Sequence, residues 1–184
     1  MSTREQSAQL RNSGLTIAVL AITSAPLLAQ SAFPRADVFG GYSWVSLDSG
    51  SSRHNLNGWT GQASVNLNSW FGVTGDFGGY YGKVSGATIH DYTCLFGPTF
   101  TYRAPHVDPF FHALFGGSHV TGSGGGASVS NSAFAMGIGG GLDVSIGSVV
   151  GFRLAQVDWL RTQHFSSSQN NIRLSTGIFL QFGK

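Results

Sequence analysis

Residues 171–182 read NIRLSTGIFLQF, and this stretch decides the fold class. Most even-numbered positions carry large apolar side chains, and most odd-numbered positions carry small or polar ones. The apolar set is Ile172, Leu174, Ile178, Leu180 and Phe182, and the opposing set is Arg173, Ser175, Gly177 and Gln181. Since successive side chains of a strand point to opposite faces, the pattern predicts a β-strand with one apolar face and one polar face.

The same alternation recurs along the chain, and no helical period of 3.6 residues competes with it after residue 33. We count eight strand segments, at residues 37–47, 58–67, 70–81, 89–102, 107–120, 132–144, 149–160 and 171–182. Their lengths are close to the 9 to 11 residues that a tilted transmembrane strand needs, and exceed the mode of about 5 to 6 residues in soluble sheets.

Composition indicates which face meets solvent. Only 10% of the residues are charged and 27 are glycine, whereas a soluble domain carries roughly 25% charged residues. A face made of glycine and small polar residues could not fill the core of a soluble barrel, so the apolar face points outward into lipid. The predicted fold is an all-β, eight-stranded, antiparallel, up-and-down transmembrane β-barrel.

The predicted connections alternate in length. Short ones fall at 68–69, 103–106 and 145–148, and longer ones, rich in Gly, Ser and Asn, fall at 48–57, 82–88, 121–131 and 161–170. Outer-membrane barrels have short periplasmic turns and longer external loops, so we expect the second set to lie outside the cell.

The amino-terminal segment has the pattern of an export signal. Residues 1–14 are polar and carry Arg4 and Arg11, and residues 15–29 are apolar without a charge. A run of this length is too short for a membrane-spanning helix, which needs about 20 residues. We predict a cleavable signal peptide at 1–29, with cleavage after Ala32 as the alternative, and a barrel domain at 30–184 exported through the secretory pathway to the bacterial outer membrane.

Three segments resemble the OmpA/OmpX-like family of small outer-membrane β-barrels: ADVFGGYSWV at 36–45, FFHALFGGS at 110–118 and QNNIRLSTGIFLQF at 169–182. The resemblance implies eight antiparallel strands. It also implies a carboxy-terminal signal for the barrel-assembly machinery, carried by Thr176, Gly177, Leu180 and Phe182. Family members often end on the aromatic residue, whereas Gly183 and Lys184 follow it here.

Inward-facing charges suggest a polar plug. Charged side chains cost roughly 2 to 4 kcal/mol when they face lipid at mid-membrane, so those within the strands are expected to pair inside the barrel. A β-bulge near residues 154–155 would turn all the polar side chains of its strand inward. The predicted interior network is Gln62, Asp76, His112, Arg153, Gln156, Asp158 and Arg173. A gated ion path is the alternative, but eight strands leave no open lumen, which favours the plug.

No motif predicts catalysis, and no cofactor or metal site is expected. The sequence has no GxSxG or HExxH motif, its single cysteine is Cys94, and its only Glu is Glu5. After residue 29, eight Lys and Arg face seven Asp, which argues against nucleic-acid binding.

We therefore expect a non-catalytic barrel that contributes to envelope structure or surface interaction. A lipid-modifying enzyme and a minor narrow channel are the alternatives. The expected partners are outer-membrane lipid, lipopolysaccharide and the barrel-assembly machinery, and the expected state is a monomer.

Overall fold

The computed structural model describes residues 33–48, 53–84, 86–125, 127–164 and 167–183. The predicted signal peptide and both predicted cleavage points lie outside these residues. No helix within them is long and apolar enough to cross a membrane.

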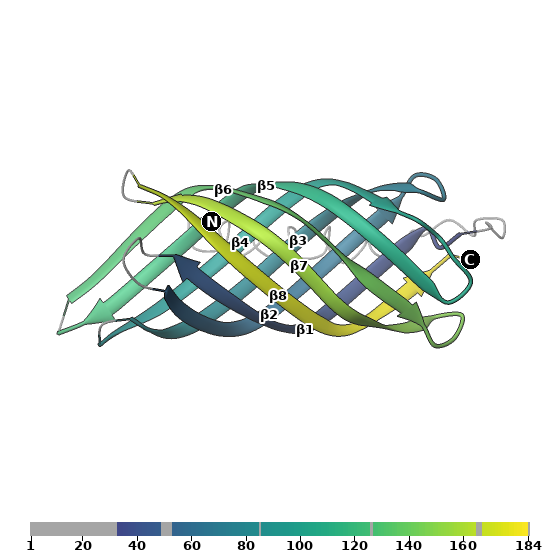
Figure 1. The fold of residues 1–184 in the computed structure, drawn as a ribbon. Helices are drawn as coiled ribbons and strands as arrows, with labels where there is room; N and C mark the ends of the chain where they lie inside the picture. The colour runs from purple at the N-terminus through teal and green to yellow at the C-terminus, as the bar shows by residue number, and fades with distance from the viewer. Residues whose placement is uncertain (1–32, 49–52, 85, 126, 165–166, 184) are drawn as a thin grey trace, which may run out of the picture. The chain divides into compact units, whose positions relative to one another are not determined.

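Eight strands form a closed barrel in sequence order (Figure 1). Every neighbouring pair is antiparallel, and β8 closes the barrel against β1. The strands are β1 Ala36–Asp48, β2 Arg53–Asn66, β3 Phe71–Val84, β4 Ala87–Thr101, β5 Val107–Gly124, β6 Ala127–Ser145, β7 Val150–His164 and β8 Ser167–Phe182. The predicted all-β, eight-stranded antiparallel barrel is confirmed.

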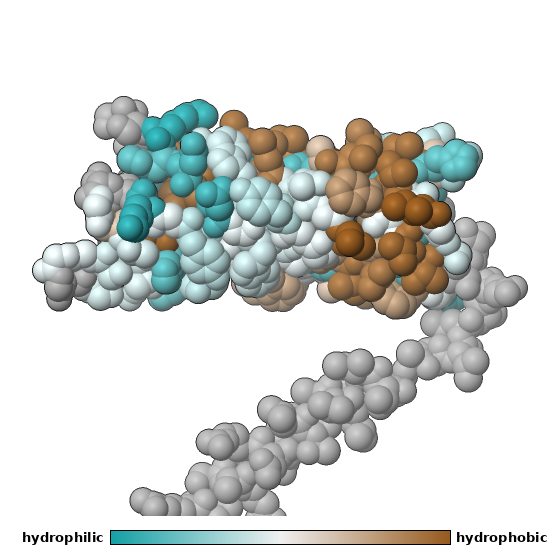
Figure 2. Space-filling model, turned by 90° about the horizontal axis from the view of Figure 1, so that it is seen from below, coloured by the Kyte–Doolittle hydropathy of each residue, from teal (hydrophilic) through white to brown (hydrophobic). Residues whose placement is uncertain are grey.

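The wall has its apolar face on the outside. In β2, Trp59 is 47% exposed while the adjacent Thr60 is 1% exposed, and Gln62 is buried where Val65 is exposed. The other strands repeat this inverted alternation, which would be unfavourable in water and is favourable in lipid. Figure 2 shows the apolar side chains gathered in a belt, displaced toward the end of the barrel where the C-terminus lies.

The two ends of the barrel differ. At the turn end, which we define by residues 67–70, 102–106 and 146–149, the connections are short and the C-terminal end of β8 lies beside them. In the first turn the Asn68 side chain accepts hydrogen bonds from the backbone N–H groups of Trp70 and Phe71, at 2.9 and 2.8 Å. This Asx arrangement fixes the reversal between β2 and β3.

The opposite end, the hairpin end, corrects the prediction of longer loops. Strand pairing continues to Asp48↔Arg53, Val84↔Ala87, Gly124↔Ala127 and His164↔Ser167, so much of each predicted loop is strand. The prediction was wrong because these segments lack apolar alternation. Beyond the lipid both faces of a strand meet water, so a strand there needs no apolar face.

Large aromatic rings fill part of the interior. Phe39, Phe110 and Phe179 are buried, and each ring lies over a glycine of its own or a neighbouring strand: a Cβ on Gly41 would lie 2.7 Å from the Phe39 ring, and one on Gly141 would lie 2.9 Å from the Phe110 ring. The glycines on the inner face thus make room for rings, a role that the alternation of the sequence did not reveal.

Candidate functional site: the charged interior of the barrel

The polar residues predicted to face inward all lie inside the barrel. Gln156, Asp76, Asp158 and Arg173 are 0% exposed, and Gln62, His112 and Arg153 are also buried. The predicted bulge is present in β7: Asp143 pairs with Arg153 but Leu142 pairs with Ala155, so Leu154 has no partner in β6. The extra residue changes the parity of β7, which is why Arg153, Gln156 and Asp158 share the interior.

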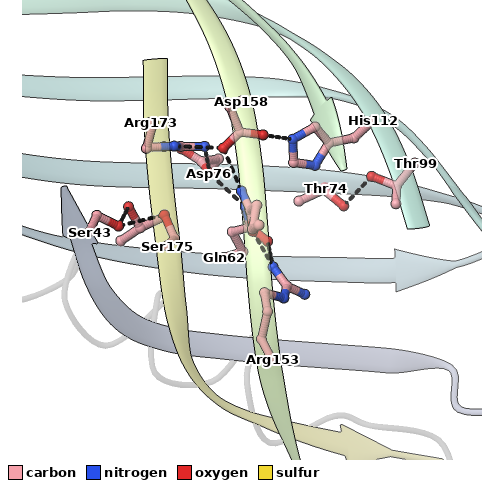
Figure 3. Close-up of polar contacts among 12 residues, drawn as sticks. Ser43, Gln62, Thr74, Asp76, Thr99, His112, Arg153, Asp158, Arg173 and Ser175 are labelled. Atoms are coloured by element: carbon pink, nitrogen blue, oxygen red, sulfur yellow. Dashed lines mark hydrogen bonds and ion pairs between the residues drawn. The ribbon is translucent and has the colours of Figure 1, made fainter. Parts of the chain in front are cut away.

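Arg173 on β8 lies at the centre of this network (Figure 3). Its two terminal nitrogens donate to both oxygens of Asp76, each at 2.8 Å, in a bidentate pair. Its Nε donates to Asp158 Oδ2 at 2.7 Å, and Nη1 also donates to the Tyr80 hydroxyl at 2.9 Å. One guanidinium thus joins carboxylates from β3 and β7 across the barrel, using the fork geometry that only arginine offers.

Three further side chains complete the surroundings of the two carboxylates. Gln156 Nε2 donates to Asp158 Oδ2 at 2.7 Å, and His112 Nε2 lies 2.7 Å from Asp158 Oδ1. Gln62 Nε2 donates to Asp76 Oδ2 at 2.7 Å. Each buried carboxylate therefore has several partners, which offsets part of the desolvation cost of its charge.

Arg153 forms a second centre nearer the turn end. It makes a bidentate pair with Asp143, at 2.7 and 2.9 Å, and its Nη1 donates to the side-chain oxygens of Gln62 and Gln156, each at 2.5 Å. Its guanidinium carbon lies 4.2 Å from the ring centroids of both Phe39 and Phe110. The glutamines connect this centre to that of Arg173, so the ionic groups form one array.

The predicted interior network omitted Asp143, Tyr80 and a group of paired hydroxyl side chains. Asp143 has the inward parity of β6 but lies near the strand end, where a surface position was equally plausible. Tyr80 shares the inward parity of Asp76, but no interior role was predicted for it. Hydroxyl pairs were not predicted at all, although parity places them inside; they are Ser43 with Thr60, Ser43 with Ser175, Ser64 with Thr74, and Thr74 with Thr99, at 2.7 to 2.8 Å.

The array holds two arginines against three aspartates, with His112 beside one of them. Zero exposure at Arg173, Asp76 and Asp158 means that no void large enough for water adjoins these groups. In the described part of the chain, no three His, Cys, Asp or Glu side chains are arranged to hold a metal ion. The arrangement can therefore cross-link strands through charge.

One Ser/His pair lies on the outer wall. His119 Nδ1 is 2.7 Å from Ser132 Oγ, and the second ring nitrogen of His119 is 3.5 Å from the Thr121 hydroxyl. The carboxylate of Asp91 accepts a hydrogen bond from Ser118 inside the barrel, at 2.6 Å. A nucleophilic triad needs an acid that orients the histidine. Among the described residues of the outer wall, the second ring nitrogen of His119 lies beside the hydroxyl of Thr121 and not beside a carboxylate.

The predicted assembly-signal residues lie on β8 at the seam that closes the barrel. Leu180 and Phe182 point outward. Gly177 lies against β1, where a Cβ would meet the backbone of Gly40 and Gly41. The Thr176 hydroxyl donates to the backbone oxygen of Arg153 at 2.9 Å, beside the β7 bulge.

Known structures share this architecture. The Neisserial surface protein NspA superposes with a TM-score of 0.71 at 13% identity, over 83% of this chain and all of that one. Ail of Yersinia pestis gives 0.58 at 18% identity, over 80% and 99%. The N-terminal barrel of Pseudomonas aeruginosa OprF gives 0.56 at 12%, over 82% and 99%.

Sequence comparison agrees with this likeness. The profile described as "Outer membrane protein beta-barrel domain" matches residues 15–180. Among curated proteins, none matches the chain.

Proposed function

This chain belongs to the outer membrane protein beta-barrel domain family, and from that premise we propose that it is a non-catalytic barrel, plugged by its own polar side chains, which contributes to envelope structure or to interactions at the cell surface. Its location is the bacterial outer membrane. The turn end lies toward the periplasm and the hairpin end lies outside, as in barrels of this kind.

The observation that carries the plug is the burial of Arg173 together with both of its aspartates. A conducting pore needs a continuous water-filled path, and ions lining such a path would be exposed to it. Here the guanidinium of Arg173 bonds to both carboxylates, and Gln62 on β2 and Gln156 on β7 donate to them as well. Moving an ion through the centre would require this array to open, and breaking a buried pair costs several kcal/mol.

The dimensions support a role at the surface. β5 and β6 contain 18 and 19 residues, which at about 3.3 Å per residue and a tilt of about 40° rise about 45 Å along the barrel axis. The apolar belt of an outer-membrane barrel is only about 25 Å tall. The β5–β6 hairpin would therefore stand about 20 Å beyond the lipid, within the sugar layer of lipopolysaccharide.

Names of similar proteins are consistent with this role. Ail is the attachment invasion locus protein of its organism, and it has also been solved with the heparin analogue sucrose octasulfate. For this chain we propose outer-membrane lipid and lipopolysaccharide as the surroundings, assembly by the barrel-assembly machinery, removal of a signal peptide at 1–29, and a monomeric state.

Planar-bilayer recording tests the plug. Purified, refolded barrel should give no steady conductance, and liposomes containing it should not swell in isotonic small sugars. Steady wild-type conductance whose ion preference changes in Arg153→Ala without a change in stability would replace the plug by a channel.

A further inference from the structure

Two prolines interrupt the ladder between β4 and β5. Pro98 lies in β4 and Pro109 lies in β5, and proline has no backbone N–H to donate. At the turn end, the N–H of Tyr102 donates to the carbonyl of Pro109 at 2.9 Å. Two residues paired in this way in an antiparallel ladder exchange two hydrogen bonds, but Pro109 cannot return the second one. The carbonyl of Tyr102 therefore receives no ladder hydrogen bond from β5.

The same ladder lacks a second bond deeper in the wall. The register between β4 and β5 is unbroken and places Pro98 opposite Ala113. Since hydrogen-bonded pairs recur at every second residue, Pro98 also removes a bond, the one to the carbonyl of Ala113. Four residues separate Pro98 from Tyr102, and at about 3.3 Å per residue and a tilt of about 40° this gap lies about 10 Å deeper in the membrane. The two gaps share their chemistry and differ in depth.

A hollow of about 400 Å³ opens on the outer wall beside the shallower gap. Tyr102 and Pro109 line it, together with Trp70, Phe100 and Phe111. The rings of Trp70 and Phe100 are stacked with their centroids 5.9 Å apart, and Phe100 pairs across the strands with Phe111. All five residues are exposed on the face of the wall that meets lipid. The hollow thus continues the lipid-facing surface, and hydrocarbon is the occupant that its walls favour.

The hollow lies at the depth of the membrane interface. Trp70 is 57% exposed and Tyr102 is 73% exposed, and both belong to the short connections of the turn end. Their side chains combine an apolar ring with one polar group, as is typical of aromatic residues at the headgroup level. A lipid bound here would place its chain against Phe100 and Phe111 and its headgroup beside the carbonyl of Tyr102.

The unreturned bond at Tyr102 specifies the headgroup. A backbone carbonyl at the edge of the hydrocarbon is unfavourable without a donor, and its oxygen accepts over a broad range of directions. The ammonium group of phosphatidylethanolamine has N–H donors, whereas that of phosphatidylcholine has the same charge and no N–H. We propose that the hollow binds a phospholipid of the periplasmic leaflet, of the phosphatidylethanolamine class, whose ammonium group donates to the carbonyl of Tyr102.

Quenching of Trp70 fluorescence by brominated lipid tests this site. Trp44→Phe, Trp59→Phe and Trp159→Phe together leave Trp70 as the remaining tryptophan. The folded barrel is placed in vesicles of brominated phosphatidylcholine mixed with an unbrominated test lipid of the same chain length. A test lipid that occupies the hollow protects Trp70 from quenching. The protection therefore gives the association constant of the test lipid relative to phosphatidylcholine.

We expect phosphatidylethanolamine to associate at least about threefold more tightly than phosphatidylcholine. N,N-dimethyl-phosphatidylethanolamine should also be preferred, because it keeps one N–H at the same charge. Pro109→Ala restores the N–H that bonds to the carbonyl of Tyr102, and should bring the ratio of association constants to within about 1.5-fold of one. Pro98→Ala is the matched control, because it restores the deeper bond and should leave the preference unchanged.

Four results would overturn the lipid site: equal association of phosphatidylethanolamine and phosphatidylcholine, a dimethylated lipid that behaves like phosphatidylcholine, a preference that survives Pro109→Ala, or an equal loss of preference in Pro98→Ala. Heat-shifted gel migration confirms that each variant is folded. If the barrel with three phenylalanine replacements does not fold, the difference between wild-type protein and Trp70→Phe isolates the signal of Trp70. If Pro109→Ala does not fold, the lipid series on the unchanged prolines decides.

This inference rests on the proposed orientation of the barrel but fails separately from the proposed function. A barrel that is silent in bilayers and shows no lipid preference loses only the lipid site. A conducting barrel loses the plug, whatever lipid Trp70 prefers.

Discussion

Truncating Arg173 to alanine should be the most damaging single change to the stability of the barrel. The guanidinium makes three hydrogen bonds to Asp76 and Asp158 and a fourth to Tyr80. Without it, two carboxylates stay buried with only Gln62, Gln156 and His112 as partners. Removing one side of a buried ion pair costs about 3 to 5 kcal/mol. Because one cation pairs with two anions here, we expect Arg173→Ala to lower the free energy of unfolding by an amount at the upper end of that range.

Reversible urea unfolding in lipid vesicles measures this loss, with tryptophan fluorescence and gel migration as independent probes. A loss of about 3 to 5 kcal/mol lowers the folding equilibrium constant by a factor of about 100 to 4,000. Adding Asp76→Asn and Asp158→Asn to Arg173→Ala should recover a large part of the loss, because no unpaired charge then remains. That recovery separates charge from lost packing.

Arg161→Ala is the matched control. Arg161 is exposed on the outer wall, and its described hydrogen bond is to Ser168 at 3.3 Å. Arg161→Ala should therefore lower the free energy of unfolding by no more than about 0.5 kcal/mol. Arg103 would be a poor control because it pairs with Asp37 and Asp108 at the turn end. If Arg173→Ala unfolds at the same urea concentration as Arg161→Ala, the interior array does not stabilise the barrel.

Four further expectations follow from the same wall and interior. Leu180→Arg should block assembly far more than Gln181→Arg, because position 180 faces lipid and position 181 is buried. An arginine that faces lipid costs roughly 2 to 4 kcal/mol. Equal yields of folded protein from the two variants would contradict the assignment of the two faces of β8. Unboiled protein should migrate differently from boiled protein on a denaturing gel, and identical migration with a helical circular dichroism spectrum would refute the barrel. Arg153→Ala should lower the unfolding midpoint and leave bilayers silent or only leaky, since it removes the cation of Asp143. Expression of wild-type protein and of Ser132→Ala should give the same lipid A mass spectrum, and an acyl change that depends on Ser132 would establish catalysis by the outer Ser/His pair.

The alternation of apolar and polar side chains was enough to predict most of the fold. In NIRLSTGIFLQF the alternation identifies a lipid-facing side and an inner side. A closed barrel follows, because unpaired backbone groups at a strand edge are unfavourable in lipid. The same reasoning placed the β7 bulge, since Arg153 and Asp158 cannot both point inward from an unbroken strand. Parity has no meaning where both faces are wet, which is why the external strand extensions were mistaken for loops.

The partners within the interior could be predicted only in part. Alternation assigns Arg173 and Asp76 to the same side of the wall, but it does not say that β8 and β3 face each other across the barrel at the same height. That depends on the tilt and stagger of all eight strands, which no local pattern encodes. Tyr80 was missed for this reason, since its partner Arg173 lies on β8. Asp143 pairs with Arg153 on the neighbouring strand and was missed because it lies near a strand end.

The rings that lie over inner-face glycines constrain how this protein can change over generations. Gly41 cannot gain a side chain, because a Cβ there would collide with the backbone of Thr176 as well as with the ring of Phe39. If Phe39 became smaller, the glycine beneath it could not grow to fill the void. Compensation would have to come from β7, two strands away around the barrel, where Arg153 lies against the same ring. A substitution at position 39 should therefore be tolerated only together with a compensating substitution at position 153, although the two strands are far apart in the chain. A pairwise mutational scan of positions 39 and 153 would show whether the effects of the two substitutions on folding are coupled.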